Sequence, residues 1–385
     1  MRPFNSILHL LFITGVIFVM SACKSGDSST KTGMSDDNGI TEFIIDVTNP
    51  ADISIKDLWD KIELVPLETT EECMIGSLTD VLYRDNIYYV FDEQQSSLYL
   101  FSDDGKYIDK IHGQGRGPGE YMLLYDFEIN PFTGNIELLN PRGEILVYNQ
   151  NCNFLEKINI PLRASHFFTN LSPEEVIFYS TYENKKIHYL VRGCDSIYKS
   201  EYSFLDYIAG TQIISGKRSP FYRYGDEVYF LDAVYYRIKT FNGGQLADEY
   251  CIDFKGKNID FNTLPQDKEL PYYVNYFLTG DKPYALQNFI INDSLMVLRC
   301  IYKRVWHTVM IDRTSHDTKV IKKFKEDVVF PGIFDFNDEG IYSIVEPVHI
   351  KLLVNSLILD DVNSKKLEEV DMDSNPVIIK YHFKD

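Results

Sequence analysis

Basic residues are scarce in this sequence. Its 385 residues include 38 lysines and arginines against 57 aspartates and glutamates, which gives a formal net charge of −19. Binding of nucleic acid or of anionic lipid head groups requires a basic footprint. We therefore expect neither as a partner. An acidic surface serves the solubility of an exported protein, and a surface that attracts cations or basic ligands is the alternative.

Closely spaced cysteine pairs are absent. The sequence has six cysteines, and their spacing fits neither a zinc site nor a thiol redox motif. Five of them follow the N-terminal segment, namely Cys73, Cys152, Cys194, Cys251 and Cys300. This odd number leaves at least one thiol unpaired, although disulfides are compatible with export. We expect scattered buried thiols, and a Cys152–Cys194 disulfide is the first pairing to test.

Catalytic and metal-binding motifs are absent as well. The sequence contains no G-x-S-x-G elbow, no H-E-x-x-H and no EF-hand loop. No pair of carboxylates stands out as the acid and base of a glycoside hydrolase. We therefore assign no catalytic residue, cofactor or metal ligand, and we leave open only a calcium ion bound in a central channel.

A long apolar run occurs only at the N-terminus. Residues 7–20 read ILHLLFITGVIFVM, which is shorter than the roughly 20 residues of a membrane span and fits the core of a signal peptide. The run Met20-Ser21-Ala22-Cys23 resembles the bacterial lipobox. The pattern predicts a lipoprotein signal peptide over residues 1–22 and lipid on Cys23. An ordinary cleaved signal is the alternative.

The segment after Cys23 is small and polar. Residues 24–38 read KSGDSSTKTGMSDDN, a composition that has nothing to bury and favours disorder. We expect residues 23–40 to be a disordered tether. A lipid on Cys23 would hold the protein at a membrane surface, so we predict an exported protein anchored to the outer membrane, facing the periplasm or the cell surface.

Aromatic residues are abundant, with 27 tyrosines and 25 phenylalanines but only two tryptophans. Tyrosine and phenylalanine favour strands. Short β-rich runs separated by turn residues recur with a period of about 40 residues, as in repeat folds. Five such units span residues 75–112, 125–161, 166–204, 221–254 and 284–324. A sixth, less regular unit begins near residue 332, includes a predicted short helix within residues 347–360, and ends in a strand over residues 376–383.

Six units of four antiparallel strands indicate an all-β chain that folds as a six-bladed β-propeller, with a short helical insertion in the last blade. We predict one domain over residues 41–385. A propeller ring must close, and two strand-like segments precede the first unit, Glu42–Val47 and Lys61–Leu67. One of them is expected to pair with the C-terminal strand. A two-domain β-sandwich is the alternative.

The run Gly113–Tyr121 (GQGRGPGEY) resembles the GxGxGPGEY signature of the six-bladed β-propeller lipoproteins of Gram-negative bacteria, a family of NHL-like propellers. Weaker similarities lie in four other segments, at residues 62–68 (IELVPLE), 98–110 (LYLFSDDGKYIDK), 195–198 (DSIY) and 375–377 (NPV). The resemblance implies the propeller fold and an exported setting. It implies no agreed reaction or ligand, so no catalytic residue is carried over.

The glycine-rich run is the first candidate site. It lacks the Lys-Ser/Thr ending of a phosphate-binding loop, and no helix pattern follows it. Its place between two predicted blades suggests that Arg116 and Glu120 project into the mouth of the central channel, with His112 and Tyr121 beside them. A tight inter-blade turn, in which glycine allows positive φ, is the alternative.

The segment between the fourth and fifth units is the second candidate. Residues 258–283 are long for a connection between blades, and long connections in compact folds often carry function. Tyr272, Tyr273 and Tyr276 lie within it and could form a platform for a carbohydrate. Packing of these rings against the blades is the alternative.

Three functions fit these features. We favour a module that binds a glycan, a peptide or an envelope protein at the channel mouth. A propeller enzyme, either a lyase or a hydrolase with its site at the channel, is the second hypothesis, and it rests on analogy of fold alone. A structural subunit of an envelope complex is the third.

Overall fold

The computed structural model describes residues 33–35, 40–160, 167–180, 186–191, 197–203, 219–242, 245–265, 267–330, 332–337 and 339–384. All of these belong to one compact unit, residues 31–385. The predicted signal peptide and Cys23 lie outside the described residues, as does Cys194. No helix among the described residues is long and apolar enough to cross a membrane.

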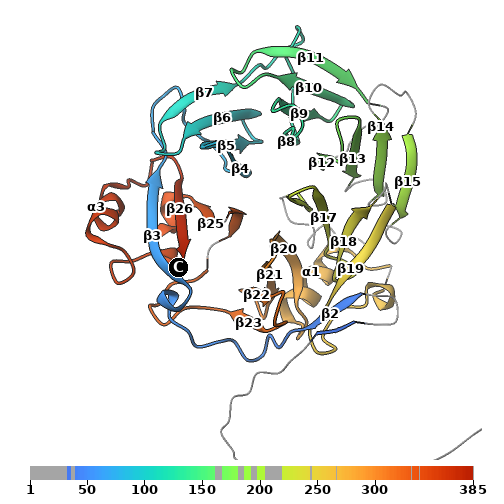
Figure 1. The fold of residues 1–385 in the computed structure, drawn as a ribbon, viewed down its shortest axis with the longest axis vertical. Coiled ribbons are helices and arrows are strands. Elements are labelled where there is room, and N and C mark those ends of the chain that lie inside the picture. Colours follow the sequence, from blue (N-terminus) through green and yellow to red (C-terminus); the bar gives the residue numbers. More distant parts are fainter. Residues whose placement is uncertain are drawn as a thin grey trace, which may run out of the picture. The chain divides into compact units, whose positions relative to one another are not determined.

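The described strands form six sheets, which follow one another along the chain and are arranged in a ring (Figure 1). Sheet I contains β4 (Asp80–Arg84), β5 (Ile87–Asp92), β6 (Ser97–Ser102) and β7 (Tyr107–Ile111). Sheet II contains β8 (Asp126–Ile129), β9 (Ile136–Asn140), β10 (Glu144–Tyr148) and β11 (Phe154–Asn159). Sheet III contains β12 (Phe167–Asn170), β13 (Glu175–Ser180), β14 (Lys186–Val191) and β15 (Ile197–Ser203).

The second half of the chain continues the pattern. Sheet IV contains β16 (Phe221–Tyr224), β17 (Glu227–Asp232), β18 (Arg237–Asn242) and β19 (Gln245–Asp253), joined by β2 (Thr41–Ile44) and β1 (Gly33–Ser35). Sheet V contains β20 (Tyr284–Ile291), β21 (Leu295–Tyr302), β22 (Val305–Asp312) and β23 (Thr318–Ile321). Sheet VI contains β24 (Ile333–Phe336), β25 (Gly340–Val345), β26 (Val377–Phe383) and β3 (Trp59–Pro66). The fold is therefore an all-β propeller with few helices.

The prediction of four strands in every blade is correct for five sheets and wrong for sheet IV. That sheet has six strands because β2 pairs in parallel with the outer strand β19, and β1 pairs with β2. Both strands come from the N-terminal part of the chain. Strand β1 also lies within residues 23–40, which were predicted to be disordered.

The local sequence explains how the chain turns from one strand to the next. Asp85 and Asn86 connect β4 to β5 with φ values of 53° and 62°, the positive values that a two-residue hairpin requires and that aspartate and asparagine tolerate. The second strand of sheets I, II and IV ends in Asp92, Asn140 or Asp232, and each of these side chains accepts a hydrogen bond from a backbone N–H in the following turn. The turns are thus fixed locally.

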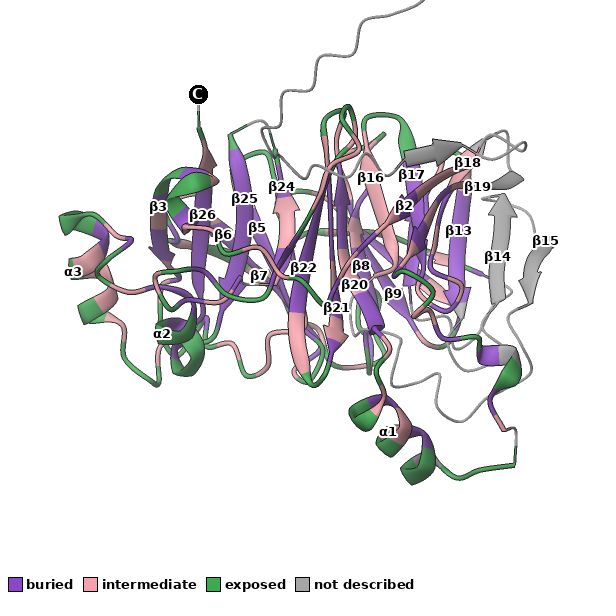
Figure 2. Cartoon of the chain, turned by 90° about the horizontal axis from the view of Figure 1, so that it is seen from below, coloured by how far each residue is buried: buried purple, intermediate pink, exposed green. Residues whose placement is uncertain are grey.

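The core lies between the sheets, as Figure 2 shows by the burial of their strands. Separate clusters of buried apolar residues join sheets I and II, II and III, V and VI, and VI and I. A fifth cluster joins sheets III, IV and V. Each sheet therefore buries both faces against its neighbours, which is the reason that the sheets need a ring.

Ring closure occurs in sheet VI. Strand β3 pairs with the C-terminal strand β26 from Trp59↔Phe383 to Pro66↔Val377. This confirms the prediction that one of two N-terminal segments pairs with the C-terminal strand, and identifies it as residues 61–67 rather than 42–47. The latter segment overlaps β2 and runs along sheet IV instead.

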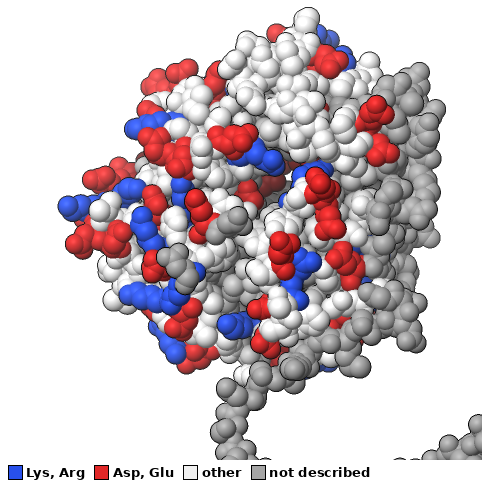
Figure 3. Space-filling view, viewed as in Figure 1, with Lys and Arg blue, Asp and Glu red and all other residues white. Residues whose placement is uncertain are grey.

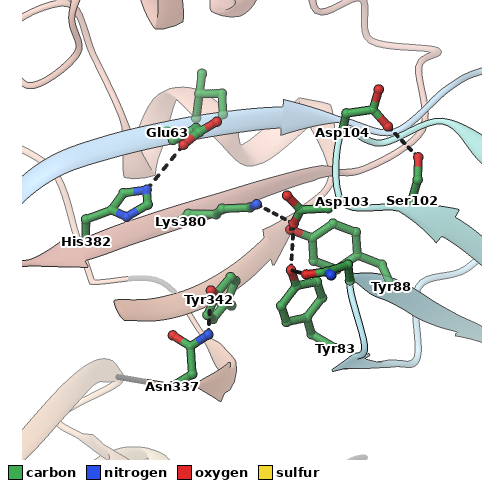
Figure 4. A network of polar contacts seen from close by, with 12 residues as sticks. Glu63, Tyr83, Tyr88, Ser102, Asp103, Asp104, Asn337, Tyr342, Lys380 and His382 are labelled. Atoms are coloured by element: carbon green, nitrogen blue, oxygen red, sulfur yellow. Dashed lines mark hydrogen bonds and ion pairs between the residues drawn. The ribbon is translucent and has the colours of Figure 1, made fainter. Parts of the chain in front are cut away.

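A polar network crosses the seam between sheets VI and I (Figure 4). The nearly buried Lys380, on β26, makes a 2.6 Å ion pair with Asp103 in the turn after β6. The Tyr83 hydroxyl donates to the same carboxylate at 2.7 Å. On the neighbouring strand β3, Glu63 lies 3.2 Å from His382. The seam therefore combines apolar packing with a charged link.

Residues 40–58, which we call the belt, run across sheet V between β2 and β3 (Figure 1). The Ala51 N–H donates to Val320 of β23 at 2.7 Å. Farther along, the Ile55 N–H donates to the Glu326 carboxylate at 3.0 Å, and the Ser54 hydroxyl donates to the same carboxylate. The belt thus contacts sheets IV and V and the connection that follows β23.

Three α-helices lie outside the described sheets. Helix α1 (Leu270–Thr279) protrudes below the ring in Figure 2 and falls in the segment that the sequence suggested was a long loop. Helices α2 (Ile350–Leu353) and α3 (Asp361–Glu369) lie between β25 and β26. The predicted helical insertion is confirmed by α2, whereas α3 begins where the predicted helix ended.

Candidate functional site: the central cavity

A cavity of about 170 Å³ lies on the axis of the ring. Its walls come from the first strand of every sheet, β4, β8, β12, β16, β20 and β24. Figure 3 shows an opening near the middle of this face, with acidic and basic side chains gathered around it. The charged residues that line it are Asp80, Arg84, Asp126, Glu128, Arg223 and Asp335.

Several of the polar side chains in this lining connect neighbouring inner strands. The inner strands of adjacent sheets do not pair with each other, so backbone groups along their free edges need partners. Asp126 accepts a hydrogen bond from the Phe168 N–H at 3.0 Å, and Glu128 accepts one from the Asn170 N–H at 2.9 Å. Asp335 accepts a backbone hydrogen bond from Phe336, and the Tyr83 backbone across the seam lowers the pKa of Asp335. These carboxyl groups therefore serve the fold as well as the cavity.

Glu128 belongs to a dense polar cluster. It lies directly opposite Glu137 across the β8–β9 pair. The Asn170 amide donates to both carboxyl groups, at 2.6 Å to Glu128 and 3.1 Å to Glu137, and the Thr169 hydroxyl donates to Glu128 at 2.6 Å. Two facing carboxyl groups that share one amide favour a state in which one of them carries a proton.

Burial changes the acidity of the cavity. It raises the pKa of Glu128 and that of Asp335 to about 7 each, against the hydrogen bonds that favour their charged forms. It raises the pKa of Asp126 well above its usual range. Because Glu128 and Asp335 are each partly neutral near pH 7, these two carboxyl groups add less negative charge to the cavity than exposed ones would.

The two arginines of the cavity come from opposite sides of the ring. Arg223 is on β16 in sheet IV and is half-buried, and burial lowers its pKa. Arg84 is at the end of β4 in sheet I and is exposed. Two sheets lie between them in either direction, so the two guanidinium groups approach the axis from opposite walls of the same cavity.

Aromatic rings complete the lining, contributed by Phe127, Phe168, Phe221, Tyr222, Phe289 and Phe334. Tyr222 stacks on Phe336 with ring centroids 6.3 Å apart and meets Phe289 edge-on at 6.1 Å. Such apolar walls with a few charged groups are typical of small-molecule sites.

The glycine-rich run forms the connection from β7 to β8, as the sequence predicted, and its residues do not line the cavity. Gly119 has a φ of 76°, and a Cβ there would meet the Phe154 ring at 2.7 Å, so this position requires glycine. The Tyr121 side chain is buried, and its hydroxyl donates to the carbonyls of Ser96 and Ile111. Tyr121 is therefore a core residue and not accessible to a ligand.

The three other candidates in and beside this run are exposed. The Glu120 carboxylate accepts a hydrogen bond from the Gly117 N–H at 2.6 Å, which ties the loop to itself. His112 Nδ1 lies 2.7 Å from the Ser97 hydroxyl. Arg116 and Glu120 are not part of the cavity wall, and their role in ligand binding stays a prediction.

The three tyrosines of the second candidate lie on helix α1. Tyr273 is fully buried and donates its hydroxyl to the Pro265 carbonyl, whereas Tyr272 is 41% exposed and Tyr276 is half-buried. Tyr272 meets Tyr273 edge-on with ring centroids 5.4 Å apart. The helix thus separates the tyrosines instead of presenting a single platform.

Metal and thiol chemistry receive no support from the described residues. No group of three or more histidine, cysteine, aspartate or glutamate side chains in that part of the chain is placed to hold a metal ion. Cys73, Cys152 and Cys300 are free thiols. Burial raises the pKa of Cys152 and that of Cys300 to about 12, which suppresses the reactive thiolate.

Sequence reasoning missed the charged residues of the cavity. A signal was present, since the first strand of four repeat units carries charged residues within an otherwise apolar run. These strands read DVLYR in β4, DFEI in β8, FYRY in β16 and IFDF in β24. Because the first strand of each propeller blade faces the axis, these residues could have been assigned to the channel.

Residues 42–382 match the protein family described as "Domain of unknown function (DUF4934)", and the chain belongs to this family. A candidate exported protein from Bacteroides fragilis has a similar structure, with a TM-score of 0.70 at 15% identity over 89% of this chain and 99% of that one. A duf4221 family member from Bacteroides vulgatus matches with a TM-score of 0.49 at 12% identity, over 84% and 97%. At such identity, the first likeness shows a shared fold alone. No curated protein matches the sequence.

Proposed function

We propose that this protein is an exported, lipid-anchored module that binds a small ligand in its central cavity. The observation that carries the proposal is the cavity itself, in which charged and aromatic side chains from all six inner strands face one space of about 170 Å³. Pockets that bury most of a drug-sized ligand are larger, roughly 300–1,000 Å³. The ligand is therefore a small molecule, or one terminal group of a glycan, peptide or envelope protein.

Binding is tested by filling the cavity. Ser219 lines it and is small, so Ser219→Trp should block it. Glycan and peptide arrays should give ligands that bind the wild-type protein, with affinity reduced at least roughly tenfold in this variant. Ser294→Trp, in an exposed turn outside the cavity lining, is the matched control and should bind normally. Arrays that yield no ligand, or ligands that Ser219→Trp binds equally well, would contradict the proposal. Turnover of a bound compound would support a propeller enzyme instead.

Export and lipidation rest on the N-terminal sequence, with its apolar run and the cysteine after two small residues. The resemblance to propeller lipoproteins and the description of the Bacteroides fragilis protein as a candidate exported protein support them. Growth with labelled palmitate should label the wild-type protein in the outer-membrane fraction. Cys23→Ser should remove both the label and the membrane association. Label that persists in Cys23→Ser would rule out this cysteine as the anchor.

A further inference from the structure

The guanidinium group of Arg223 is half-buried and charged, yet not all of its N–H donors have hydrogen-bond partners within the described part of the chain. One terminal nitrogen donates to the Asn170 carbonyl, and the guanidinium lies 5.6 Å from the centre of the Phe132 ring. Its Nε–H is buried and has no hydrogen-bond partner among the described residues. A buried donor without a partner costs about 1–3 kcal/mol, so an acceptor at this position would be strongly favoured.

No described carboxylate forms an ion pair with Arg223. The nearby Glu128 raises the pKa of Arg223 by its charge, but its two oxygens accept hydrogen bonds from Thr169 and Asn170. An unpaired charge that is removed from water is costly, and a bound anion would offset that cost. The positive charge of Arg223 is therefore available to a ligand.

Arg84 strengthens this positive potential from the other side of the ring. It lines the same cavity, and its charge is close enough to lower the pKa of Arg223. Its guanidinium makes no hydrogen bond or ion pair with any side chain in the part of the protein that the structure describes. Two like charges that face one space favour an anion between them.

We propose that the ligand of the central cavity carries a carboxylate, which Arg223 binds through Nε and a terminal nitrogen and which Arg84 attracts from the opposite wall. This inference rests on the proposed function and specifies its ligand class. A guanidinium group presents two parallel N–H donors that match a carboxylate. The neighbouring rings of Tyr222, Phe289 and Phe334 suit a compact body such as a sugar ring or an aromatic ring.

The test compares acids with their neutral counterparts by isothermal titration calorimetry. The probes are glucuronate against glucose, and phenylacetate against phenylacetamide, with inorganic phosphate as a separate anion. At least one acid should bind the wild-type protein more tightly than its neutral partner. Arg223→Gln should lower the affinity for that acid roughly 10- to 100-fold, which is the range expected for the loss of a hydrogen bond to a charged group.

Two further variants make the result specific. Arg142→Gln removes an exposed arginine outside the cavity lining and should bind as the wild type does. Arg223→Lys keeps the charge but loses the paired donors, so it should bind the acid with intermediate affinity. Thermal melting of each variant establishes that it is folded.

The outcomes separate the two proposals. If neutral probes bind as well as acids and only Ser219→Trp abolishes binding, the cavity binds a ligand but the carboxylate class is wrong. If phosphate is the only anion that distinguishes the wild-type protein from Arg223→Gln, the carboxylate class is also overturned. If no anion distinguishes these two proteins, the inference about Arg223 fails.

Discussion

At the scale of single residues, the central cavity places side chains under competing demands. Glu128 accepts a hydrogen bond from a backbone N–H of the neighbouring sheet and Asp335 accepts one from its own strand, yet burial raises the pKa of each to about 7. A carboxyl group that is needed as an acceptor is thereby made easy to protonate. Glu128 thus links two sheets, and both carboxyl groups set the charge that a ligand meets.

This conflict predicts a pH-dependent stability. The pKa of Glu128 is about 7 in the folded protein and roughly 4.3 in an unfolded chain. The folded state therefore binds the proton on Glu128 more tightly than the unfolded chain does. The stabilisation of the fold by this proton is complete below pH ~4.3 and is lost as the pH rises through about 7. The free energy of unfolding should fall over this interval by up to ~1.4 kcal/mol per pH unit for one proton.

Glu128→Gln should remove this contribution. Urea unfolding between pH 4.5 and 8 should show a shallower fall for the variant than for the wild type. Asp335 and Asp126 keep the same sign of dependence, so the slope decreases without vanishing. Glu71→Gln, at an exposed position, should retain the wild-type slope. Equal slopes for Glu128→Gln and wild type would show that Glu128 does not titrate in this range.

The sequence predicted some residues and not others, for physical reasons. The glycine-rich run was placed correctly between two blades because glycine and proline have local conformational requirements. The burial of Tyr121 was not predicted, because the Tyr121 hydroxyl donates to the carbonyl groups of Ser96 and Ile111, which lie 15 positions apart in the sequence. The partners of Arg223 and Glu128 likewise come from other sheets.

At the scale of elements, strands were easier to predict than helices. The hairpins carry their signals in adjacent residues, as with Asp85 and Asn86. Helix α1 depends on distant contacts instead. Phe277 stacks on Tyr284 with ring centroids 5.4 Å apart, and Arg304 donates to the Leu278 carbonyl at 3.1 Å near the end of the helix. A pattern of tyrosines in the sequence could not reveal these partners.

The belt provides a test at this scale. Glu326→Ala removes the acceptor for Ile55 N–H and the Ser54 hydroxyl, so the belt should open more often. Hydrogen exchange within residues 46–58 should accelerate roughly 10- to 100-fold, since hydrogen bonds to a charged group contribute about 1.5–3 kcal/mol. Asp327→Asn changes the adjacent exposed residue and should leave this exchange unchanged. Unaltered exchange in Glu326→Ala would show that other contacts hold the belt.

At the scale of the whole molecule, the ring depends on one strand from the far end of the chain. Strand β3 buries Trp59, Leu64 and Val65 against its neighbours. Burial of such side chains contributes about 1.5–3 kcal/mol each, which together approaches the total stability of a typical domain, roughly 5–15 kcal/mol. The period of the repeats predicted the ring, and the surplus of strands at the N-terminus predicted that one of them closes it.

Truncation should expose this dependence. A chain that starts at residue 40 keeps the belt and β3, and it should unfold cooperatively with a melting temperature close to that of a chain that starts at residue 23. A chain that starts at residue 67 lacks β3 and should lose cooperative unfolding, as seen by calorimetry and near-UV circular dichroism. A cooperative transition in the shorter chain would mean that the ring closes without this strand.

If the protein is anchored at Cys23 as proposed, the belt lies between that anchor and the ring-closing strand. With the proposed anchor at Cys23, drag on the propeller pulls on the N-terminal end of the chain. That tension must detach β2 from sheet IV and then residues 51–55 from the region of sheet V before it reaches β3. The attachments of the belt would therefore break first. The ring-closing strand β3, and with it the cavity, would be loaded last.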